Sequence, residues 1–295
     1  MRVLIFGKSG QVSRELARLT WPEQTEVVQL GRETCDFSRP STIAAAIEPI
    51  APDFVINAAA YTAVDRAESE PELAMAVNGE SPREIARACA RLGAALVHIS
   101  TDYVFDGRKA APYLEVDAVC PISTYGRTKE AGEAGIRAEL ERHLIVRTSW
   151  VFAGHGANFV RTMLRLGAER PELRVVADQH GAPTSARDIA LALRGLVVAR
   201  AEGRGTWGTF HFTSKDPTTW FGFAKAVIEG AALASVPKIS PITTAEYPTP
   251  AVRPANSVLD CSRIQQEFGI VQPSWRVALS DVLTETKIGQ PAAGG

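Results

Sequence analysis

Short apolar runs alternate with amphipathic segments through the first half of the chain. The apolar runs predict β-strands at residues 2–6, 26–30, 53–57, 95–100 and 144–148. The segments between them carry apolar residues three and four positions apart, as at Val12, Leu16 and Leu19, which is the spacing of a helix that buries one face. Alternating strands and helices form βαβ units with right-handed crossovers, so the sequence predicts a parallel sheet covered by helices on both faces.

The regular pattern is interrupted at two places. The longest helical pattern contains Pro82, and because proline has no N–H to donate, we expect a break in the helix there. After about Trp150, glycine and proline become denser and the alternation of strands and helices weakens. This change predicts a smaller and less regular second part.

The composition is typical of a globular protein. The 295 residues are 45% hydrophobic, and the mean hydropathy is −0.03. The 32 basic and 33 acidic residues leave a formal charge of −1, so no net field attracts nucleic acid or an anionic membrane. The apolar start before Gly7 is too short for a signal peptide, and no run reaches the roughly 20 residues of a membrane span. We therefore expect a cytoplasmic protein without nucleic-acid or membrane partners.

The residues that bind metals in other proteins are scattered here. The four cysteines contain no CxxC pair, and the histidines show no spacing typical of metal ligands. His98, on the fourth predicted strand, is interpreted as a packed core histidine rather than a base. The sequence therefore predicts no metal site.

Two glycines follow the first predicted strand, in the segment GKSGQVS that opens the first predicted helix. Backbone N–H groups at a helix N-terminus attract a pyrophosphate, and glycines such as Gly7 and Gly10 let the backbone approach it. An ordinary tight turn also uses glycine, and Ser13 stands where a dinucleotide fingerprint usually has a third glycine. The segment is thus a candidate phosphate loop.

The end of the second predicted strand bears on the choice of cofactor. An acidic residue there would hold the adenosine ribose of NAD, but the chain has Gly31 and Arg32. Arg32 is able to pair with a 2′-phosphate, so we expect NADPH to be favoured without exclusion of NADH. The alternative interpretation is that Arg32 is only a solvated charge on a loop. Asp36 and Phe37 lie where an adenine edge would be met.

Small residues at the end of the third predicted strand complete the candidate cofactor site. Ala58, Ala59 and Ala60 leave room for a cofactor to lie against the strand ends, although ordinary packing of a sheet against a helix uses alanine as well. The fold class is therefore α/β, a Rossmann-type doubly wound parallel sheet with a smaller C-terminal substrate-binding part. Residues 1–150 are mainly the NAD(P)-binding domain. Residues 151–290 mainly bind substrate, with some segments returning to the first domain, and residues 291–295 form a tail; we expect fraying from Gln290 onward.

A candidate catalytic group follows the fourth predicted strand. Tyr125 and Lys129 are four residues apart, so both project from one face of a helix, and nearby positive charge makes a phenol a usable proton donor. The strand itself ends in Ser100 and Thr101, where a hydroxyl is able to polarise a substrate carbonyl. Each motif alone is common in surface helices or strand ends. Their order after a glycine loop favours a nicotinamide-dependent reductase.

Seven segments carry a more specific likeness, which extends over nearly the whole chain, from Met1 to about Trp275. They are GKSGQVSRELAR, NAAAYTAVDRAESEPELAMAVN, VHISTDYVFDG, YGRTKEAGE, RTSWVFAGHGANFVRTMLRL, DQHGAPTSARDIA and YPTPAVRPANS. These residues resemble the extended short-chain dehydrogenase/reductases and, more closely, the dTDP-4-dehydrorhamnose reductase family. The resemblance implies NAD(P)H-dependent reduction of dTDP-4-dehydro-β-L-rhamnose to dTDP-β-L-rhamnose, the last step of dTDP-L-rhamnose biosynthesis.

The resemblance also implies roles for particular residues. The implied catalytic residues are Thr101, Tyr125 and Lys129, with Tyr125 as the proton donor to the alkoxide at C4. The implied cofactor contacts are Gly10, Gln11, Val12, Asp36, Phe37, Ala60 and Thr62. The implied substrate contacts are Thr101, Asp102 and Trp150, with loops at residues 178–184 and 253–256 that include Arg253 and Asn256. Independently of the resemblance, an aromatic ring such as Trp150 stacks on a sugar or base, and Arg253 suits a diphosphate.

The chain departs from the family at a metal site. Some members dimerise through magnesium held by glutamates; Glu15 is present here, but Arg187 stands where those members have a carboxylate. Because a cation repels the metal, we expect no dimer of that kind, and the protein is expected to be a monomer or a homodimer.

Three other functions are considered. A sugar-nucleotide 4,6-dehydratase needs an acid after the Thr-Asp pair, whereas Thr101 and Asp102 precede Tyr103. A non-catalytic dinucleotide-binding regulatory subunit would not need Thr101, Tyr125 and Lys129. A sister reductase of another dTDP-4-keto-6-deoxysugar stays open, since a few side chains outside the motifs decide substrate choice.

Overall fold

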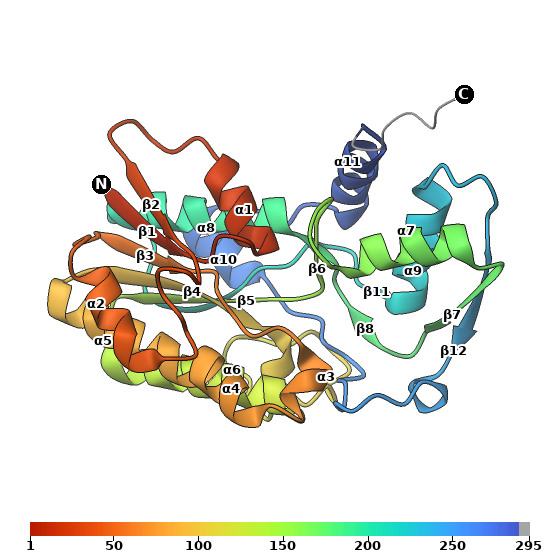
Figure 1. Ribbon diagram of the computed structural model, residues 1–295, viewed down its shortest axis with the longest axis horizontal. Helices are drawn as coiled ribbons and strands as arrows, with labels where there is room; N and C mark the ends of the chain where they lie inside the picture. Colours follow the sequence, from red (N-terminus) through yellow and green to blue (C-terminus); the bar gives the residue numbers. More distant parts are fainter. Residues whose placement is uncertain (289–295) are drawn as a thin grey trace.

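The computed structural model describes residues 1–288 and shows two parts side by side (Figure 1). The expected tail from Gln290 lies outside the described residues. The first part contains one parallel sheet of six strands in the order β10-β5-β4-β3-β1-β2. The strands are β1 (Arg2–Phe6), β2 (Glu26–Leu30), β3 (Phe54–Asn57), β4 (Ala95–Thr101), β5 (His143–Thr148) and β10 (Gly208–His211). The predicted Rossmann-type doubly wound sheet is confirmed.

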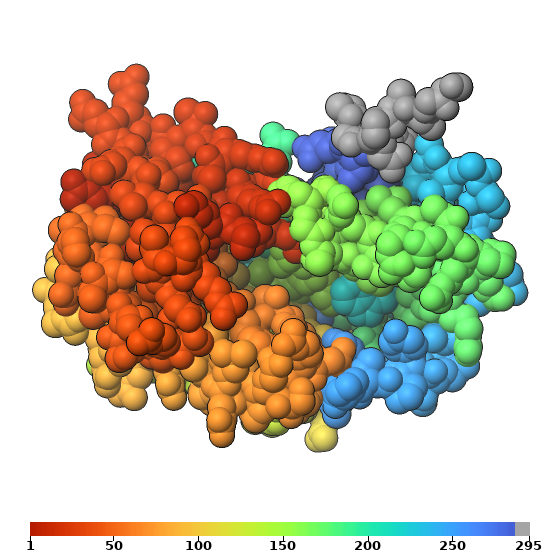
Figure 2. Space-filling view, in the orientation of Figure 1, coloured from red at the N-terminus to blue at the C-terminus, as the bar shows by residue number. Residues whose placement is uncertain are grey.

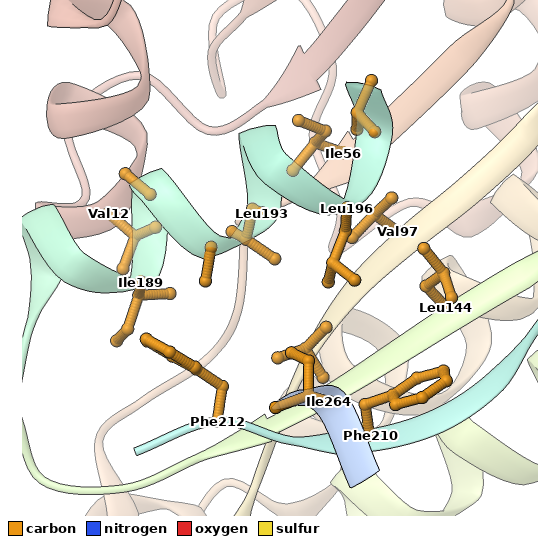
Figure 3. Close-up of a cluster of buried hydrophobic side chains, with 14 of the residues drawn as sticks. Val12, Ile56, Val97, Leu144, Ile189, Leu193, Leu196, Phe210, Phe212 and Ile264 are labelled. Atoms are coloured by element: carbon orange, nitrogen blue, oxygen red, sulfur yellow. The ribbon is translucent and has the colours of Figure 1, made fainter. Parts of the chain in front are cut away.

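Helices cover both faces of this sheet. One face carries α1 (Gln11–Arg18), α8 (Ala186–Ala201) and α10 (Ser262–Phe268). The other carries α2 (Ile43–Ile47), α5 (Ser81–Leu92) and α6 (Thr124–Glu139). Successive residues of β1 point to opposite faces, so Ile5 packs under the first set of helices and Leu4 under the second. In Figure 3, Leu193 and Leu196 of α8 lie over Val97 and other strand residues.

The second part is built almost entirely after Trp150. Its core contains Phe152, Phe223 and Trp275, which lie between α7 (Phe159–Glu169), α9 (Trp220–Gly230) and α11 (Trp275–Ile288). Three strand pairs complete it: β6 (Val151–Phe152) with β9 (Thr184–Ser185), β8 (His180–Gly181) with β11 (Thr218–Thr219), and β7 (Glu172–Val176) with β12 (Lys238–Ile242). Within residues 1–288, no helix has the length and apolar character needed to cross a membrane.

The sixth strand of the sheet comes from the second half of the chain. β10 has four residues and pairs with β5, while α8 and α10 return to the sheet beside it. The periodic pattern predicted only five strands, because a four-residue segment that begins with glycine and follows Gly203 and Gly205 gives little period to detect.

The predicted break at Pro82 takes the form of a π-helical turn that interrupts the α-helical pattern directly before it. The chain stays helical through α4 (Pro71–Met75), a π-helical turn at Ala76–Glu80 and α5. Pro82 lies in the first turn of α5, directly after the π-helical turn. The wider π-helical turn changes the hydrogen-bond register, so the missing N–H of proline is tolerated without ending the helix. Four short helical turns connect the remaining segments: α3 (Val64–Ala67) and the 3₁₀ turns Pro40–Thr42, Asp102–Val104 and Thr244–Glu246.

The π-helical turn packs directly on α6. A side-chain Cβ at Gly132 would overlap the carbonyl oxygen of Asn78. The Asn78 side chain holds the loop after β3: its Oδ1 accepts from the Tyr61 N–H at 2.8 Å, and its Nδ2 lies 3.2 Å from Thr128 Oγ1 on α6. The close approach of the two helices therefore requires glycine at position 132.

We expect Gly132→Ala to lower the free energy of unfolding by about 2 kcal/mol, because backbone on both helices must move to admit the methyl group. Gly195→Ala is the control: its Cβ would meet Ile270 at an ordinary 3.5 Å, and alanine in a helix interior is favoured by up to about 1 kcal/mol. Urea unfolding measures both. Equal stability of Gly132→Ala and the wild type would contradict this packing argument.

Candidate active site

A cavity of about 850 Å³ lies at the carboxyl ends of the parallel strands. Its walls come from both parts of the molecule, and Figure 2 shows the surface hollowed between the N-terminal region and the green segment that includes α7. Open parallel sheets bind their ligands at this edge. All the predicted site residues except Asn256 line this cavity: Gly7, Gly10, Gln11, Val12, Gly31, Arg32, Asp36, Phe37, Ala58, Ala59, Ala60, Thr62, Thr101, Asp102, Tyr125, Lys129, Trp150 and Arg253.

The glycine loop has the geometry of a phosphate cradle. Gly7 has a φ of 105°, in the region that favours glycine, and a Cβ there would press on the Ala58 carbonyl carbon at 3.3 Å. Gly10 is the N-cap of α1 and provides no side chain to cap it, so the first-turn N–H groups face the cavity edge. Ser13 is fully buried and donates its hydroxyl to the Gly10 carbonyl at 3.0 Å. The serine at the third glycine position is thus accommodated by a hydrogen bond.

A carboxylate does lie at the end of β2, although its residue comes two positions later than expected. The Glu33 side chain folds back over Gly31 and occupies the space that a side chain at position 31 would fill. Its Oε1 lies 3.1 Å from Lys8 Nζ, and Lys8 hydrogen bonding is one cause of its lowered pKa, after hydrogen bonding to its own backbone. Arg32 is largely exposed, 3.8 Å from Asp36 Oδ1. Lys8 and Glu33 were not among the predicted site residues, because their positions depend on the fold-back of Glu33 over a glycine.

The catalytic candidates meet at the end of β4. Ser123 caps the N-terminus of α6 by accepting from the Gly126 N–H at 3.1 Å, so α6 starts where Tyr125 and Lys129 face the Thr101 strand end. Thr101 Oγ1 donates to Asp102 Oδ1 at 2.9 Å and accepts from the Tyr103 N–H at 3.2 Å. The three residues predicted from separate motifs therefore line one cavity.

Burial changes the acidity of these groups. Tyr125 is 9% exposed, and desolvation raises its pKa, while a hydrogen bond with Thr101 opposes the rise. Desolvation lowers the pKa of Lys129 to about 8, and the charge of Glu133 opposes this fall. Desolvation raises the pKa of Asp102 to about 6; among the described residues its Oδ2 has no hydrogen-bond partner. The cavity thus holds a protonated phenol beside a lysine that titrates near neutral pH.

A fully buried carboxylate lies behind the catalytic candidates. Glu133, one helical turn after Lys129, accepts from Arg147 Nη2 at 2.6 Å and from Ser100 Oγ at 2.5 Å. Arg137 Nη1 donates to it at 2.9 Å. Burial alone would raise the pKa of Glu133. The hydrogen bonds and the positive charge of Arg147 outweigh burial and hold this pKa below its usual range. The network joins α6 to β4 and β5.

The second part contributes an aromatic wall. Trp150 has a φ of 47° and stacks on Trp220 with ring centroids 3.6 Å apart and planes 7° from parallel. Phe159 packs against Trp220 at 4.6 Å between centroids. Trp220 and Phe159 line the cavity as Trp150 does, but sequence analysis missed them, since aromatic residues at helix starts have no diagnostic spacing.

The two residues of the 253–256 loop lie in different environments. Arg253 reaches the cavity and forms a 2.7 Å ion pair with Asp65, with its other terminal nitrogen 3.2 Å from the Tyr103 hydroxyl. Asn256 does not line the cavity. It donates to the Lys109 carbonyl at 2.7 Å and so fixes the loop after β4.

The residues for which the resemblance implied a comparison with a metal site have other partners here. Glu15 Oε1 lies 2.5 Å from His155 Nε2 and 3.0 Å from Arg18 Nη1. Arg187 is exposed at the start of α8.

The loop after β6 also contacts α1 through a second residue. Asn158 Nδ2 donates to Gln11 Oε1 at 2.9 Å. The loop after β6 is therefore joined to the start of α1, beside the glycine loop.

Comparisons with known proteins agree with this geometry. A family model described as RmlD substrate binding domain matches residues 1–288. The dTDP-4-dehydrorhamnose reductase of Burkholderia thailandensis is 48% identical over 289 residues, 95% of this chain and 97% of the relative. That of Escherichia coli K12 is 44% identical over 97% of this chain and 98% of the relative. The crystal structure of dTDP-4-dehydrorhamnose reductase from Bacillus anthracis in complex with NADP superposes with a TM-score of 0.90, at 36% identity, over 97% of this chain and 99% of that one.

We expect Glu133→Gln to lower the free energy of unfolding by about 3 kcal/mol, because it leaves the buried Arg147 cation without its counter-charge. Glu169→Gln is the matched control. It removes the carboxylate of an exposed pair with Arg165, and such pairs contribute about 1 kcal/mol or less. Urea unfolding at neutral pH distinguishes the two. If both variants lost the same small amount, the buried network would not hold α6 to the sheet.

Proposed function

The chain belongs to the dTDP-4-dehydrorhamnose reductase family, and we propose that it catalyses the NAD(P)H-dependent reduction of dTDP-4-dehydro-β-L-rhamnose to dTDP-β-L-rhamnose. The observation that carries the proposal is the presence of Thr101, Tyr125 and Lys129 in one cavity with a glycine loop. Relatives of that name match 40–48% of positions over almost the whole chain.

The residues of the first part fit a nicotinamide dinucleotide. The left-handed Gly7 and the uncapped start of α1 suit its pyrophosphate. Ala58, Ala59, Ala60 and Thr62 would lie against it at the end of β3, with Asp36 and Phe37 near the adenine end. When bound, the reduced cofactor supplies the hydride that goes to C4 of the sugar.

Tyr125 would supply the proton to the developing alkoxide at C4. Its raised pKa keeps the phenol protonated until the oxyanion forms, and the Lys129 cation then stabilises the phenolate. The Thr101 hydroxyl would turn from Asp102 to the substrate carbonyl and polarise it. These steps need only groups that already line the cavity.

The second part would hold the sugar nucleotide. The Trp150 and Trp220 stack offers a flat face for a ring, and Arg253 suits a diphosphate because a guanidinium donates two parallel hydrogen bonds. Asp102 would accept from a sugar hydroxyl. Asn256 would act on substrate through the loop it fixes.

The cofactor end supports use of both NADPH and NADH. Arg32 and Lys8 are cations able to meet a 2′-phosphate, while the Glu33 carboxylate is able to accept from a free ribose hydroxyl. We propose that NADPH is favoured and that no magnesium bridges a dimer, since Glu15 is paired with His155 and Arg187 adds a positive charge.

We expect the protein to oxidise NADPH, and more slowly NADH, when given enzymatically prepared dTDP-4-dehydro-L-rhamnose. Absorbance follows the cofactor, and NMR identifies dTDP-L-rhamnose as the product. If neither cofactor were oxidised although both bound measurably, the substrate would be a different dTDP-4-keto-6-deoxysugar or the protein would have a regulatory role. Faster turnover with NADH would overturn the cofactor preference.

We expect Tyr125→Phe to lower kcat by a factor of about 10² to 10⁴, because it removes the proton donor and little else. Cofactor affinity, measured by quenching of intrinsic fluorescence, should stay within a factor of about two. Tyr247→Phe, on an exposed loop residue, is the control for a lost phenol hydroxyl. Near-normal turnover of Tyr125→Phe would exclude Tyr125 as the proton donor.

A further inference from the structure

His98, which the sequence suggested is an inert core residue, contacts the catalytic lysine. It lies on β4 beside Asn57 of β3, its direct neighbour in the sheet. Asn57 and His98 are 0% exposed and Lys129 is 2% exposed. Asn57 Nδ2 lies 3.0 Å from His98 Nδ1, and His98 Nε2 lies 3.2 Å from Lys129 Nζ. A continuous row of buried polar groups thus runs from β3 to the active site.

The backbone fixes which way the Asn57 amide faces. Its Oδ1 accepts from the Ala59 N–H at 3.1 Å. A flipped amide would place its NH₂ group against that N–H, donor against donor, so the oxygen faces Ala59 and the NH₂ faces His98. His98 Nδ1 therefore accepts a hydrogen bond and carries no proton.

This contact decides the tautomer of His98. A neutral imidazole has one N–H, so with Nδ1 as the acceptor the proton is on Nε2. Burial, together with the Lys129 charge, lowers the pKa of His98 well below its usual value and keeps the ring neutral. The Nε2–H then points at Lys129 Nζ.

An Nε2–H group distinguishes the two protonation states of lysine. An ammonium has three N–H donors and no lone pair, so it cannot accept the hydrogen bond that His98 Nε2–H offers, and the two groups face each other donor against donor. A neutral amine has a lone pair and is able to accept from Nε2–H. Lys129 Nζ also donates to the Ile99 carbonyl at 2.7 Å, a hydrogen bond available in both states. The His98 contact therefore favours the neutral amine.

Some of the other groups around Lys129 favour its charged form and others its neutral form. Glu133 lies one turn along α6 and favours the cation, but Arg147 from β5 and Arg137 from α6 pair with its carboxylate. The phenol of Tyr125 lies one turn before Lys129 on α6. Asp102, at the end of β4, also lines the cavity and titrates near pH 6. Burial of Lys129 disfavours its charge, and His98 adds to that effect.

We propose that His98 is a positioning residue whose Nε2–H, directed by Asn57, donates to the neutral amine of Lys129 and so lets Lys129 return a proton to Tyr125 after each reduction. This rests on the proposed reductase function. The O–H bond of Tyr125 breaks as its proton goes to the alkoxide. An N–H bond of Lys129 breaks as a proton re-forms the phenol, and Lys129 later takes a proton from solvent. His98 keeps its own proton throughout.

The tautomer is measured directly on the wild-type protein without cofactor or sugar. Long-range ¹⁵N–¹H correlation spectra separate protonated from unprotonated ring nitrogens, and the chain has only five histidines. His98→Leu assigns its signals. We expect Nε2 to be protonated and Nδ1 unprotonated from pH 6 to pH 9. A proton on Nδ1 would overturn the proposal whether or not the reductase assignment holds.

The sign of a pKa change in His98→Leu provides the second test. Lys129 is one of seven lysines, so its titration is resolved with ¹³Cε-labelled lysine and assigned with Lys129→Arg. Loss of the Nε2–H donor should raise the Lys129 pKa by about one unit and move the corresponding limb of the kcat–pH profile with it. A lower Lys129 pKa would mean that His98 accepts from the ammonium, and an unchanged pKa would mean that His98 only fills space; either result overturns the proposal. His143→Leu, on β5, is the control and should leave the Lys129 pKa unchanged.

Discussion

The buried pairing of Glu133 with Arg147 is the constraint on which the site depends. A carboxylate with no exposed surface is stable in a protein interior only when charged and polar donors surround it. Here those donors come from β4, β5 and α6 itself. Their positions fix how far along the sheet edge α6 lies and which way it is rotated. As a result, the preceding two turns of α6 present Lys129 and Tyr125 to the end of β4.

The close contact between α6 and the π-helical turn fixes the same helix from its other side. Gly132 lets the Asn78 backbone approach, and the Asn78 side chain then holds the loop that follows β3. That loop contains Ala59, whose N–H orients Asn57 and through it His98. The packing of two helices is thereby linked to the environment of Lys129, whose neighbours Asn57 and His98 are fully buried. In such surroundings each donor and acceptor has a large effect, because water does not compensate for a mismatch.

The second part closes the cavity from the opposite side. Trp150 lies two residues after the end of β5 and adopts a left-handed backbone conformation that is strained for a bulky residue. Its ring stacks on Trp220 at the start of α9, so α9 also lies at the cavity. The loop after β6 is joined to α1 by the His155 contact with Glu15 and the Asn158 contact with Gln11. The two sides of the cavity are therefore held together by side chains from both parts.

Much of this protein is determined by local sequence. Apolar period and glycine spacing are properties of neighbouring residues, so they predicted five of the six sheet strands, the glycine loop before α1 and the Tyr125 and Lys129 pair on one helix. Other features depend on residues distant in sequence. The short strand β10 pairs only because β5 provides an edge, and Pro82 is tolerated only because a π-helical turn precedes it. Glu33 reaches the end of β2 by folding over a glycine, and Trp220 becomes a wall of the cavity by stacking on Trp150. The role proposed for His98 also rests on tertiary structure alone, because the proton on an imidazole is decided by the groups at its two nitrogens, and these come from a neighbouring strand and a helix.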